Sequence, residues 1–212
     1  MGRIKRKTNP AFVIVADGET EIWYLQMMKQ NERQVRLTIK PELPKKKRIE
    51  DQCALVCELA QREYDKVFWI VDLDQIKKEQ QEATGGKKDP MRTFIECREK
   101  VLHGKKYAKQ VRVIVNNPCL EFWFLLHYTH TDKSFGGYEE LAKALKKYMK
   151  DYNKSESYFK QKNNDIYLKL KPRLKKAMEH SDRLGSFEPK DPSRAVSEMP
   201  LFFRTEELNG LF

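Results

Sequence analysis

Short apolar runs alternate with helical patterns over the first 130 residues of the chain. Runs rich in β-branched and aromatic residues, bounded by turn residues, predict buried strands at 11–16, 67–71 and 111–115, and alternating polar and apolar positions predict a half-buried strand at 35–39. Apolar residues at helical spacing predict helices at 20–28, 49–60, 90–102 and 120–128. This alternation is typical of an α/β fold, so we expect a mainly parallel, Rossmann-like sheet with helices on both faces.

The pattern changes after residue 130. Two further helical patterns cover 138–149 and 166–174, and no apolar run typical of a strand follows them. Earlier in the chain, a polar stretch at 75–89 predicts a long loop. We therefore expect a core at 1–130 and a basic helical segment at 131–212 that packs on it, with one shared domain as the alternative.

Basic residues outnumber acidic ones along the chain. Its 212 residues include 42 Lys and Arg against 31 Asp and Glu, a net charge of +11, and 40% of them are hydrophobic, which is enough for a folded core. Residues 140–180 alone carry 12 basic and 5 acidic side chains. Such a concentration is typical of a surface that binds nucleic-acid phosphates, and a solvated helix face is the alternative. The candidate phosphate contacts are Lys45, Lys46, Lys47, Arg48, Lys143, Lys146, Lys147 and Lys150.

Aromatic residues alternate with the lysines in the second half of the chain. They are Tyr148, Tyr152, Tyr158, Phe159 and Tyr167. Aromatic side chains stack on the unpaired bases of single-stranded nucleic acid, but at helical spacing they also form cores, and we favour the core for most of these. The sequence does not distinguish RNA from DNA as the partner.

Neither a membrane protein nor a disulfide framework is indicated. No window approaches 18 consecutive apolar residues, and the basic start of the chain has no apolar run long enough for a signal sequence, so we expect a cytoplasmic protein without membrane contact. The cysteines form no C-x-x-C pair, which favours buried free thiols over a metal site. They are Cys53, Cys57, Cys97 and Cys119.

Acidic side chains follow three of the predicted strands. Asp17 and Glu21 follow the first, Asp72 and Asp74 follow the third, and Glu121 lies shortly after the fourth. The carboxyl ends of parallel strands meet at one sheet edge, where ligands of α/β proteins bind. Two apart on an extended chain, Asp72 and Asp74 would point the same way. Because carboxylate oxygens suit Mg²⁺ or Mn²⁺, we expect one or two such ions at this edge, although Asp is also a common turn residue and helix cap.

Metal ions held in this way supply what phosphodiester cleavage requires, namely a nucleophilic water, charge neutralisation on the phosphate and stabilisation of the leaving oxygen. Motifs for other chemistry are lacking in the sequence. It contains no G-x-S-x-G and no phosphate-binding G-x-x-x-x-G-K-[ST], and its four histidines are not spaced as a metal site. The residues therefore favour metal-dependent hydrolysis of phosphodiester bonds.

Three motifs at these strand ends resemble those of the RloB-like family, whose core is similar to the Toprim fold of topoisomerases, primases and overcoming-lysogenization-defect nucleases. The motifs are Asp17-Gly-Glu-Thr-Glu21, with Asp17 where the family usually has Glu, then Asp72-x-Asp74, and Asn116-x-Pro-Cys-x-Glu121-x-Trp-x-Leu-x-His127. A weaker match is Asp191-Pro-Ser193, and the resemblance covers roughly residues 10–205.

The resemblance implies that Glu21, Asp72 and Asp74 ligate metal, that Asp17 takes the place of the Toprim acid–base or ligand carboxylate, and that Glu121 completes the cluster. It also implies a role in bacterial antiviral defence beside an ATPase partner. We therefore expect a Toprim-like, metal-dependent nuclease that acts on RNA or DNA. Two alternatives stay open: a non-catalytic subunit that binds nucleic acid or an ATPase partner, and a metal-dependent enzyme acting on a nucleotide second messenger.

Overall fold

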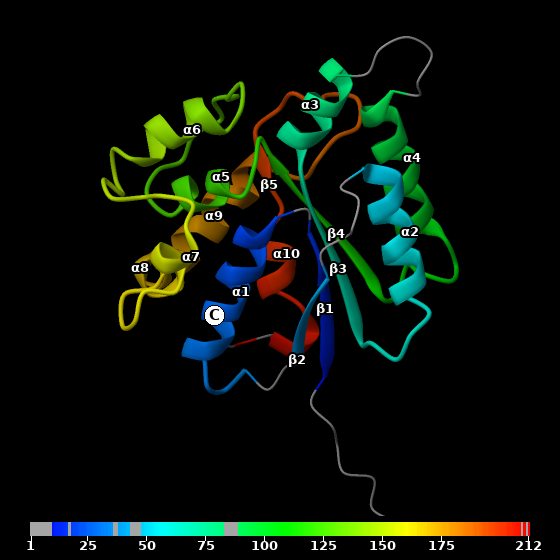
Figure 1. The fold of residues 1–212 in the computed structure, drawn as a ribbon, viewed down its shortest axis with the longest axis horizontal. Coiled ribbons are helices and arrows are strands. Elements are labelled where there is room, and N and C mark those ends of the chain that lie inside the picture. Colours follow the sequence, from blue (N-terminus) through cyan, green and yellow to red (C-terminus); the bar gives the residue numbers. More distant parts are fainter. Residues whose placement is uncertain are drawn as a thin grey trace, which may run out of the picture.

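A five-stranded sheet forms the centre of the protein (Figure 1). The structure is a computed structural model and describes residues 10–16, 18–35, 38–42, 48–82, 89–208, 210 and 212. In sheet order the strands are β2 (Thr38–Glu42), β1 (Ala11–Val15), β3 (Lys66–Asp72), β4 (Val111–Asn117) and β5 (Val196–Ser197). The first four are parallel, and β5 pairs antiparallel with β4. The predicted α/β fold with a mainly parallel, Rossmann-like sheet is confirmed.

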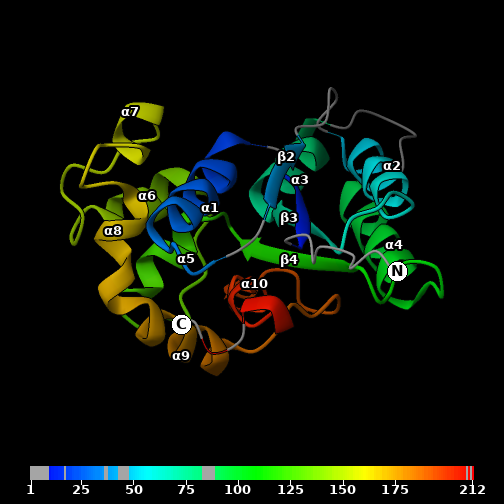
Figure 2. The same ribbon diagram turned by 90° about the horizontal axis from the view of Figure 1, so that it is seen from below.

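Helices lie on both faces of the sheet (Figures 1 and 2). The face with Val13 and Val15 shares a hydrophobic core with α2 (Ile49–Leu59), α3 (Leu73–Glu82) and α4 (Pro90–His103). The face with Phe12 and Ile14 shares a second core with α1 (Glu19–Asn31), α5 (Glu121–Leu126), α6 (Tyr138–Leu145), α7 (Glu156–Phe159), α8 (Ile166–Leu170), α9 (Leu174–Leu184) and α10 (Pro200–Phe203). Alternate residues of a buried strand thus point into two different cores.

The predicted loop at 75–89 is wrong for its first half, which belongs to α3. This helix follows β3 without a connection and buries two apolar side chains, Leu73 and Ile76. A helix with so few apolar residues lacks the stripe by which a sequence indicates a packed helix. Asp74 therefore lies in the first turn of a helix and not on an extended chain, whereas Asp72 is the last residue of β3.

The two outer strands of the sheet also differ from the prediction. The strand expected at 35–39 lies later, at Thr38–Glu42, and contains Pro41. Proline is tolerated there because β2 is an edge strand, whose outer side needs no donor. The sequence indicated no strand after residue 130, but β5 pairs with the last two residues of β4. A strand of two residues is too short for a periodic pattern to reveal.

The helices of residues 131–212 share their hydrophobic core with α1 and α5 (Figure 2). The ring of Tyr167 on α8 lies 6.2 Å from that of Tyr24 on α1, and its hydroxyl donates to Glu32 Oε1 at 2.6 Å. The helix expected at 166–174 is broken, because Pro172 lies in a short 3-10 helix, η1 (Lys171–Arg173), between α8 and α9. A second 3-10 helix, η2 (Glu206–Leu208), follows α10.

All four cysteines are thiols outside any disulfide, as predicted, and all but the half-buried Cys97 are buried. Cys53 and Cys57 lie on α2, and Cys97 lies on α4, the helix that packs beside it. The hydrogen bond with Cys97, then burial and the neighbouring thiol groups, raise the pKa of Cys53, so its thiol stays protonated at neutral pH. Of the helices that the structure describes, none is both long and apolar enough to span a lipid bilayer.

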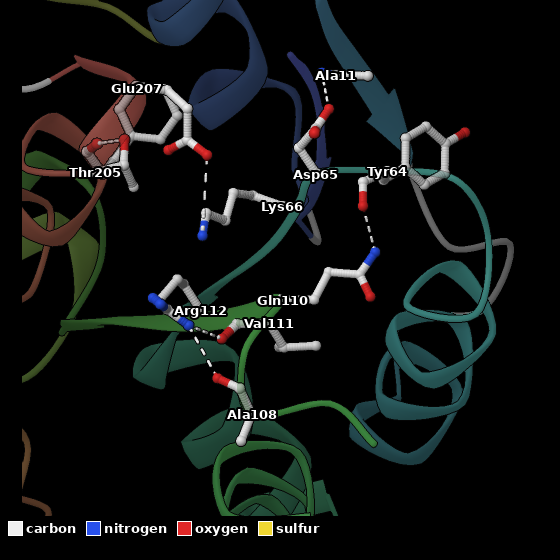
Figure 3. A network of polar contacts seen from close by, with 11 residues as sticks. Ala11, Tyr64, Asp65, Lys66, Ala108, Gln110, Val111, Arg112, Thr205 and Glu207 are labelled. Carbon is white, nitrogen blue, oxygen red and sulfur yellow. Dashed lines mark hydrogen bonds and ion pairs between the residues drawn. The ribbon is translucent and has the colours of Figure 1, made fainter. Parts of the chain in front are cut away.

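The amino ends of the central strands are tied together by polar contacts (Figure 3). The backbone N–H of Ala11 donates to Asp65 Oδ2 at 2.7 Å, and the side chain of Gln110 donates to the carbonyl of Tyr64. The guanidinium of Arg112 donates to two backbone carbonyls at 2.9 and 3.1 Å. These hydrogen bonds pair polar groups at the amino ends of the parallel strands with one another. The clustered carboxylates lie at the opposite, carboxyl ends of the strands.

Candidate carboxylate site

A half-open cavity of about 150 Å³ lies at the carboxyl ends of β1 and β3. It is lined by Gly18, Thr20, Glu21, Asp72, Asp74, Gln75, Lys78, Tyr138, Glu139 and Lys154. Because α1 and α3 begin right after these strands, their first turns carry Glu21 and Asp74 to the same place. Three of the five predicted site carboxylates, those of Glu21, Asp72 and Asp74, thus line one cavity.

Asp72 is held by donors from the neighbouring strand and loop. Its Oδ1 accepts from Asn116 Nδ2 at 3.3 Å, and its Oδ2 accepts from the backbone N–H of Leu120 at 3.2 Å. Asn116 is held in turn by β5, since its Oδ1 accepts from the hydroxyl of Ser197 at 2.7 Å. The chain from Ser197 through Asn116 to Asp72 fixes the orientation of this carboxylate, which is a role for β5 that the sequence did not indicate.

Asp74 is a buried carboxylate with little direct compensation. Its backbone N–H donates to the carbonyl of Pro118 at 3.0 Å, and Lys78 Nζ, a partly exposed cation, lies 3.8 Å from Oδ2. Burial raises the pKa of Asp74; the charges of Lys78 and Lys154 act against this, and the charge of Glu121 adds to it. A raised pKa marks a carboxylate for which a bound cation would be favourable.

Glu121 opens α5 and is completely buried. Its Oε1 accepts from the hydroxyl of Tyr152 at 2.6 Å and lies 3.0 Å from Lys154 Nζ. Its Oε2 has no hydrogen-bond partner among the residues that the structure describes. Burial by itself would lower the pKa of Lys154, but the charge of Glu121 outweighs this and holds that pKa above its usual value. Lys154 lines the cavity, and Glu121 is connected to the cavity by its contact with this lysine.

Glu21 is buried in the first turn of α1, where its Oε1 accepts from the hydroxyl of Thr20 at 3.1 Å. The backbone of Gly18 lies close to this carboxylate, since a Cβ on Gly18 would lie 3.1 Å from Glu21 Oε2 and would press on it. Asp17, the fifth predicted carboxylate, lies outside the described residues. Of the five predicted carboxylates, three thus line the cavity, and Glu121 lies behind Lys154.

The donor set of the cavity fits a small, hard cation. Its possible ligands are carboxylate oxygens, and the unsatisfied Glu121 Oε2 is a buried polar atom that a cation or its water could satisfy. Within the described ranges, no three His, Cys, Asp or Glu side chains converge on one point as metal ligands do. Mg²⁺ and Mn²⁺ commonly need only one or two protein carboxylates, with water and substrate oxygens completing their coordination.

Sequence reasoning did not find Lys154, Tyr152 or Tyr138 as parts of this site. Lys154 Nζ lies 4.2 Å from the ring centroid of Tyr138 as well as 3.0 Å from Glu121. In the sequence, Lys154 is one of twelve basic residues in a 41-residue segment, and nothing in its spacing distinguishes it from the others. Its role depends on a tertiary contact between the loop after α6 and the start of α5.

The predicted phosphate contacts are only partly described. Lys45, Lys46 and Lys47 lie outside the described residues, and Arg48 is exposed just before α2. The other four lysines are exposed on α6 and in the turns after it: Lys143, Lys146, Lys147 and Lys150. They lie outside the cavity wall, but α6 begins at Tyr138, which is part of that wall.

The turn around Ser193 is fixed by the same end of β4 that carries the site. The side-chain nitrogen of Asn117 lies 3.2, 3.0 and 2.7 Å from the carbonyl oxygens of Pro192, Ser193 and Arg194. The Asp191-Pro-Ser193 segment thus contacts β4 directly. Two motifs that lie 75 residues apart in sequence form one structural unit at the carboxyl end of the strand.

A model of the RloB-like protein family matches residues 12–203. The chain belongs to the RloB-like family. The matched range runs from β1 to α10 and includes every residue that lines the cavity of this RloB-like protein. No curated protein and no solved structure matches the chain.

Proposed function

We propose that this RloB-like protein is a Mg²⁺- or Mn²⁺-dependent nuclease that hydrolyses phosphodiester bonds of RNA or DNA. One observation carries the proposal: a half-open cavity at the ends of parallel strands in which Glu21, Asp72 and Asp74 lie together with Lys154. Carboxylates suit a cation, and a lysine suits the charge of a phosphate, so the cavity contains both parts that phosphodiester hydrolysis needs.

In this proposal one or two of the carboxylates of Glu21, Asp72 and Asp74 would hold the ion directly and the others would hold it through its water, with Glu121 and Asp17 as the further acidic groups of the site. The bound ion supplies charge neutralisation on the phosphate and a water activated for attack. Asn116 keeps Asp72 oriented through the 3.3 Å bond to Oδ1. The ammonium of Lys154, charged at neutral pH because Glu121 raises its pKa, binds a phosphate oxygen at the mouth of the cavity.

The dimensions of the cavity support a polymer over a small nucleotide. Pockets for small molecules usually measure roughly 300–1,000 Å³ and enclose most of their ligand. This cavity measures about 150 Å³ and is half open. It is large enough for a phosphate and its cation, while the remainder of the substrate lies outside. A polynucleotide backbone meets this condition better than a nucleotide second messenger does.

Removing the charge of Lys154 is expected to slow cleavage, and also to lower the stability of the fold, because the buried Glu121 loses its cation. We expect Lys154→Met to lower the rate of Mn²⁺-dependent cleavage by about 10²-fold or more, as loss of one charge-stabilising donor does in other active sites. Initial rates on a labelled oligonucleotide measure the effect, with Lys162→Met, an exposed lysine in the same segment, as the matched control. An unchanged or increased rate for Lys154→Met would contradict this role.

A second candidate function is supported by the lysines in and beside the cavity. Lys154 lies 3.0 Å from Glu121 and Lys78 lies 3.8 Å from Asp74, so protein cations already balance part of the acidic charge. A non-catalytic subunit that binds nucleic acid or an ATPase partner could retain such a cavity without a metal. It would bind RNA or DNA and leave both intact.

Incubation of the full chain with mixed RNA and DNA substrates, with Mn²⁺ and with chelator, tests the two candidates together. A nuclease produces shorter fragments only when Mn²⁺ is present. Salt-dependent binding with intact substrates at every metal concentration would overturn the nuclease and support the binding subunit.

The resemblance of the motifs motivates a wider proposal about biological role. We propose that the protein acts in the cytoplasm as an effector of antiviral defence, with a Toprim-like core and an ATPase as partner. Expression of the wild-type chain together with an ATPase of the proposed kind should reduce phage propagation, and the Asp72→Asn/Asp74→Asn double variant should not. Equal protection by both would separate defence from the carboxylate site.

A further inference from the structure

Tyr148 is an exposed aromatic side chain on an otherwise polar surface. It lies in the turns after α6 with 47% of its surface exposed, and Leu201 is the other large apolar residue with comparable exposure in the described part of the chain. The other members of the predicted aromatic series, Tyr152, Tyr158, Phe159 and Tyr167, are buried. Tyr148 is therefore the one member of that predicted series whose ring remains available to a ligand.

The ring of Tyr148 is held in place from below. It stacks on Tyr128 with a centroid distance of 5.3 Å and an interplanar angle of 19°. The guanidinium of Arg173 lies over the same Tyr128 ring, 4.9 Å from its centroid. Tyr128, two residues past the end of α5, thus supports Tyr148 directly, and Arg173 of η1 packs on Tyr128. This support lowers the entropy that a ligand stacked on Tyr148 would otherwise cost.

Positive charge surrounds this ring and has few anionic partners. Lys146, Lys147 and Lys150 are exposed within two residues of Tyr148 along the chain. Over the described ranges, no ion pair joins these lysines or Arg173 to a carboxylate. An aromatic face flanked by unpaired cations is complementary to a nucleobase flanked by phosphates.

The position of Tyr148 relates it to the cavity. Tyr138, the first residue of α6, lines the cavity, and Tyr148 lies ten residues further on, past the end of the helix. Eight helical residues span about 12 Å, a distance that a few nucleotides of a single strand can cover. A strand whose phosphate enters the cavity can therefore place a base a few nucleotides further along on Tyr148.

We propose that Tyr148, Lys147, Lys150 and Arg173 form a binding site for an unpaired base of single-stranded nucleic acid and its flanking phosphates. The proposal rests on the proposed function for the class of ligand, and adds that the ligand is single-stranded near the site. A base inside a duplex has both faces covered by its neighbours and cannot stack on a tyrosine, whereas an unpaired base can.

Binding in chelator, where metal-dependent cleavage does not occur, tests this site apart from catalysis. Fluorescence anisotropy with a labelled single-stranded oligonucleotide and its duplex is measured for the full-length wild type, Tyr148→Ala and Tyr148→Phe. Loss of one stacked base costs about 1–3 kcal/mol, so we expect Tyr148→Ala to weaken single-strand binding about 5- to 150-fold. Tyr148→Phe, which keeps the ring, should bind within about twofold of wild type, and duplex binding should not change.

Tyr107→Ala is the matched control, because Tyr107 also follows lysines and is partly exposed but lies beside the amino end of β4. The site is overturned if Tyr148→Ala binds the single strand as wild type does, if single-strand and duplex binding fall equally, or if the wild type binds neither. Dependence on Tyr148 without any Mn²⁺-dependent cleavage supports this site and overturns the nuclease. Mn²⁺-dependent cleavage together with unchanged single-strand binding by Tyr148→Ala supports the nuclease and overturns this site.

Discussion

Replacement of Asp74 by asparagine should abolish Mn²⁺-dependent cleavage while the protein stays folded. The substitution removes a negative charge from the cavity wall, and with it a ligand of the proposed ion. We expect the rate to fall at least about 10³-fold, equivalent to ~4 kcal/mol in the barrier. Because Asp74 is buried and its pKa is raised, the neutral amide does not lose a strong native interaction, and the free energy of unfolding should change by less than about 1 kcal/mol.

The neighbouring carboxylate gives a less selective variant. Both oxygens of Asp72 accept hydrogen bonds, one from the side chain of Asn116 and one from the backbone N–H of Leu120. In Asp72→Asn the side-chain NH2 would face one of these N–H donors and lose that hydrogen bond. The double variant Asp72→Asn/Asp74→Asn should be equally inactive but less stable than Asp74→Asn. Asp132→Asn, at an exposed position, is the control for both. Cleavage by Asp74→Asn at the wild-type rate would refute the assignment of the site.

His127 should make the protein sensitive to acid. His127 directly follows α5 and is fully buried. Its Nδ1 lies 2.9 Å from the carbonyl oxygen of Trp123, and its Nε2 has no hydrogen-bond partner among the described residues. Burial lowers the pKa of His127 to about 3, the carbonyl of Trp123 opposes this, and the charges of Arg173 and His180 add to it. The neutral ring is therefore the form that the fold stabilises.

The direction in which stability changes with pH follows from the pKa values of His127 in the unfolded and the folded protein. An unfolded histidine takes up a proton near pH 6.5, while His127 in the fold stays neutral down to about pH 3, so stability is complete above pH 6.5 and is lost as the pH falls between these values. Complete titration corresponds to about 5 kcal/mol, at 1.36 kcal/mol for each pH unit. At pH 4.5 the loss from this residue should already be about 3 kcal/mol.

Urea unfolding at pH 7 and pH 4.5 measures this loss. The variant His127→Phe keeps a ring against Trp123, whose ring centroid lies 4.7 Å away, and cannot take up a proton. Its unfolding free energy should therefore fall less between the two pH values than that of the wild type, by about 3 kcal/mol. His103→Gln, at an exposed position, should behave as the wild type. Identical pH dependence in His127→Phe and wild type would show that His127 does not carry the effect.

The central sheet and three of the site carboxylates could be predicted because their signals are local. Buried parallel strands require continuous apolar runs, and the residue at which such a run ends marks the edge of the sheet. Asp72 and Glu21 were located in this way. Asp74 was also placed correctly at the cavity, although the local structure assigned to it was wrong, since a helix and not an extended chain presents it.

The remainder of the site depends on contacts between distant segments. Lys154 and Tyr152 meet Glu121 because the helical segment folds back on α5, and Ser197 meets Asn116 because β5 joins the sheet. No periodic pattern in the sequence indicates these tertiary contacts. The aromatic series shows the same limit: its spacing predicted rings near lysines, but only tertiary packing separates the exposed Tyr148 from the buried Tyr152.

A crystal of the wild-type protein soaked in Mn²⁺ and examined for anomalous density provides the most direct measurement. We expect a peak in the cavity between Glu21, Asp72 and Asp74, and no such peak in crystals of Asp74→Asn. A cavity without Mn²⁺, with the Lys154 ammonium still paired to Glu121 at saturating metal, would contradict a metal-dependent nuclease.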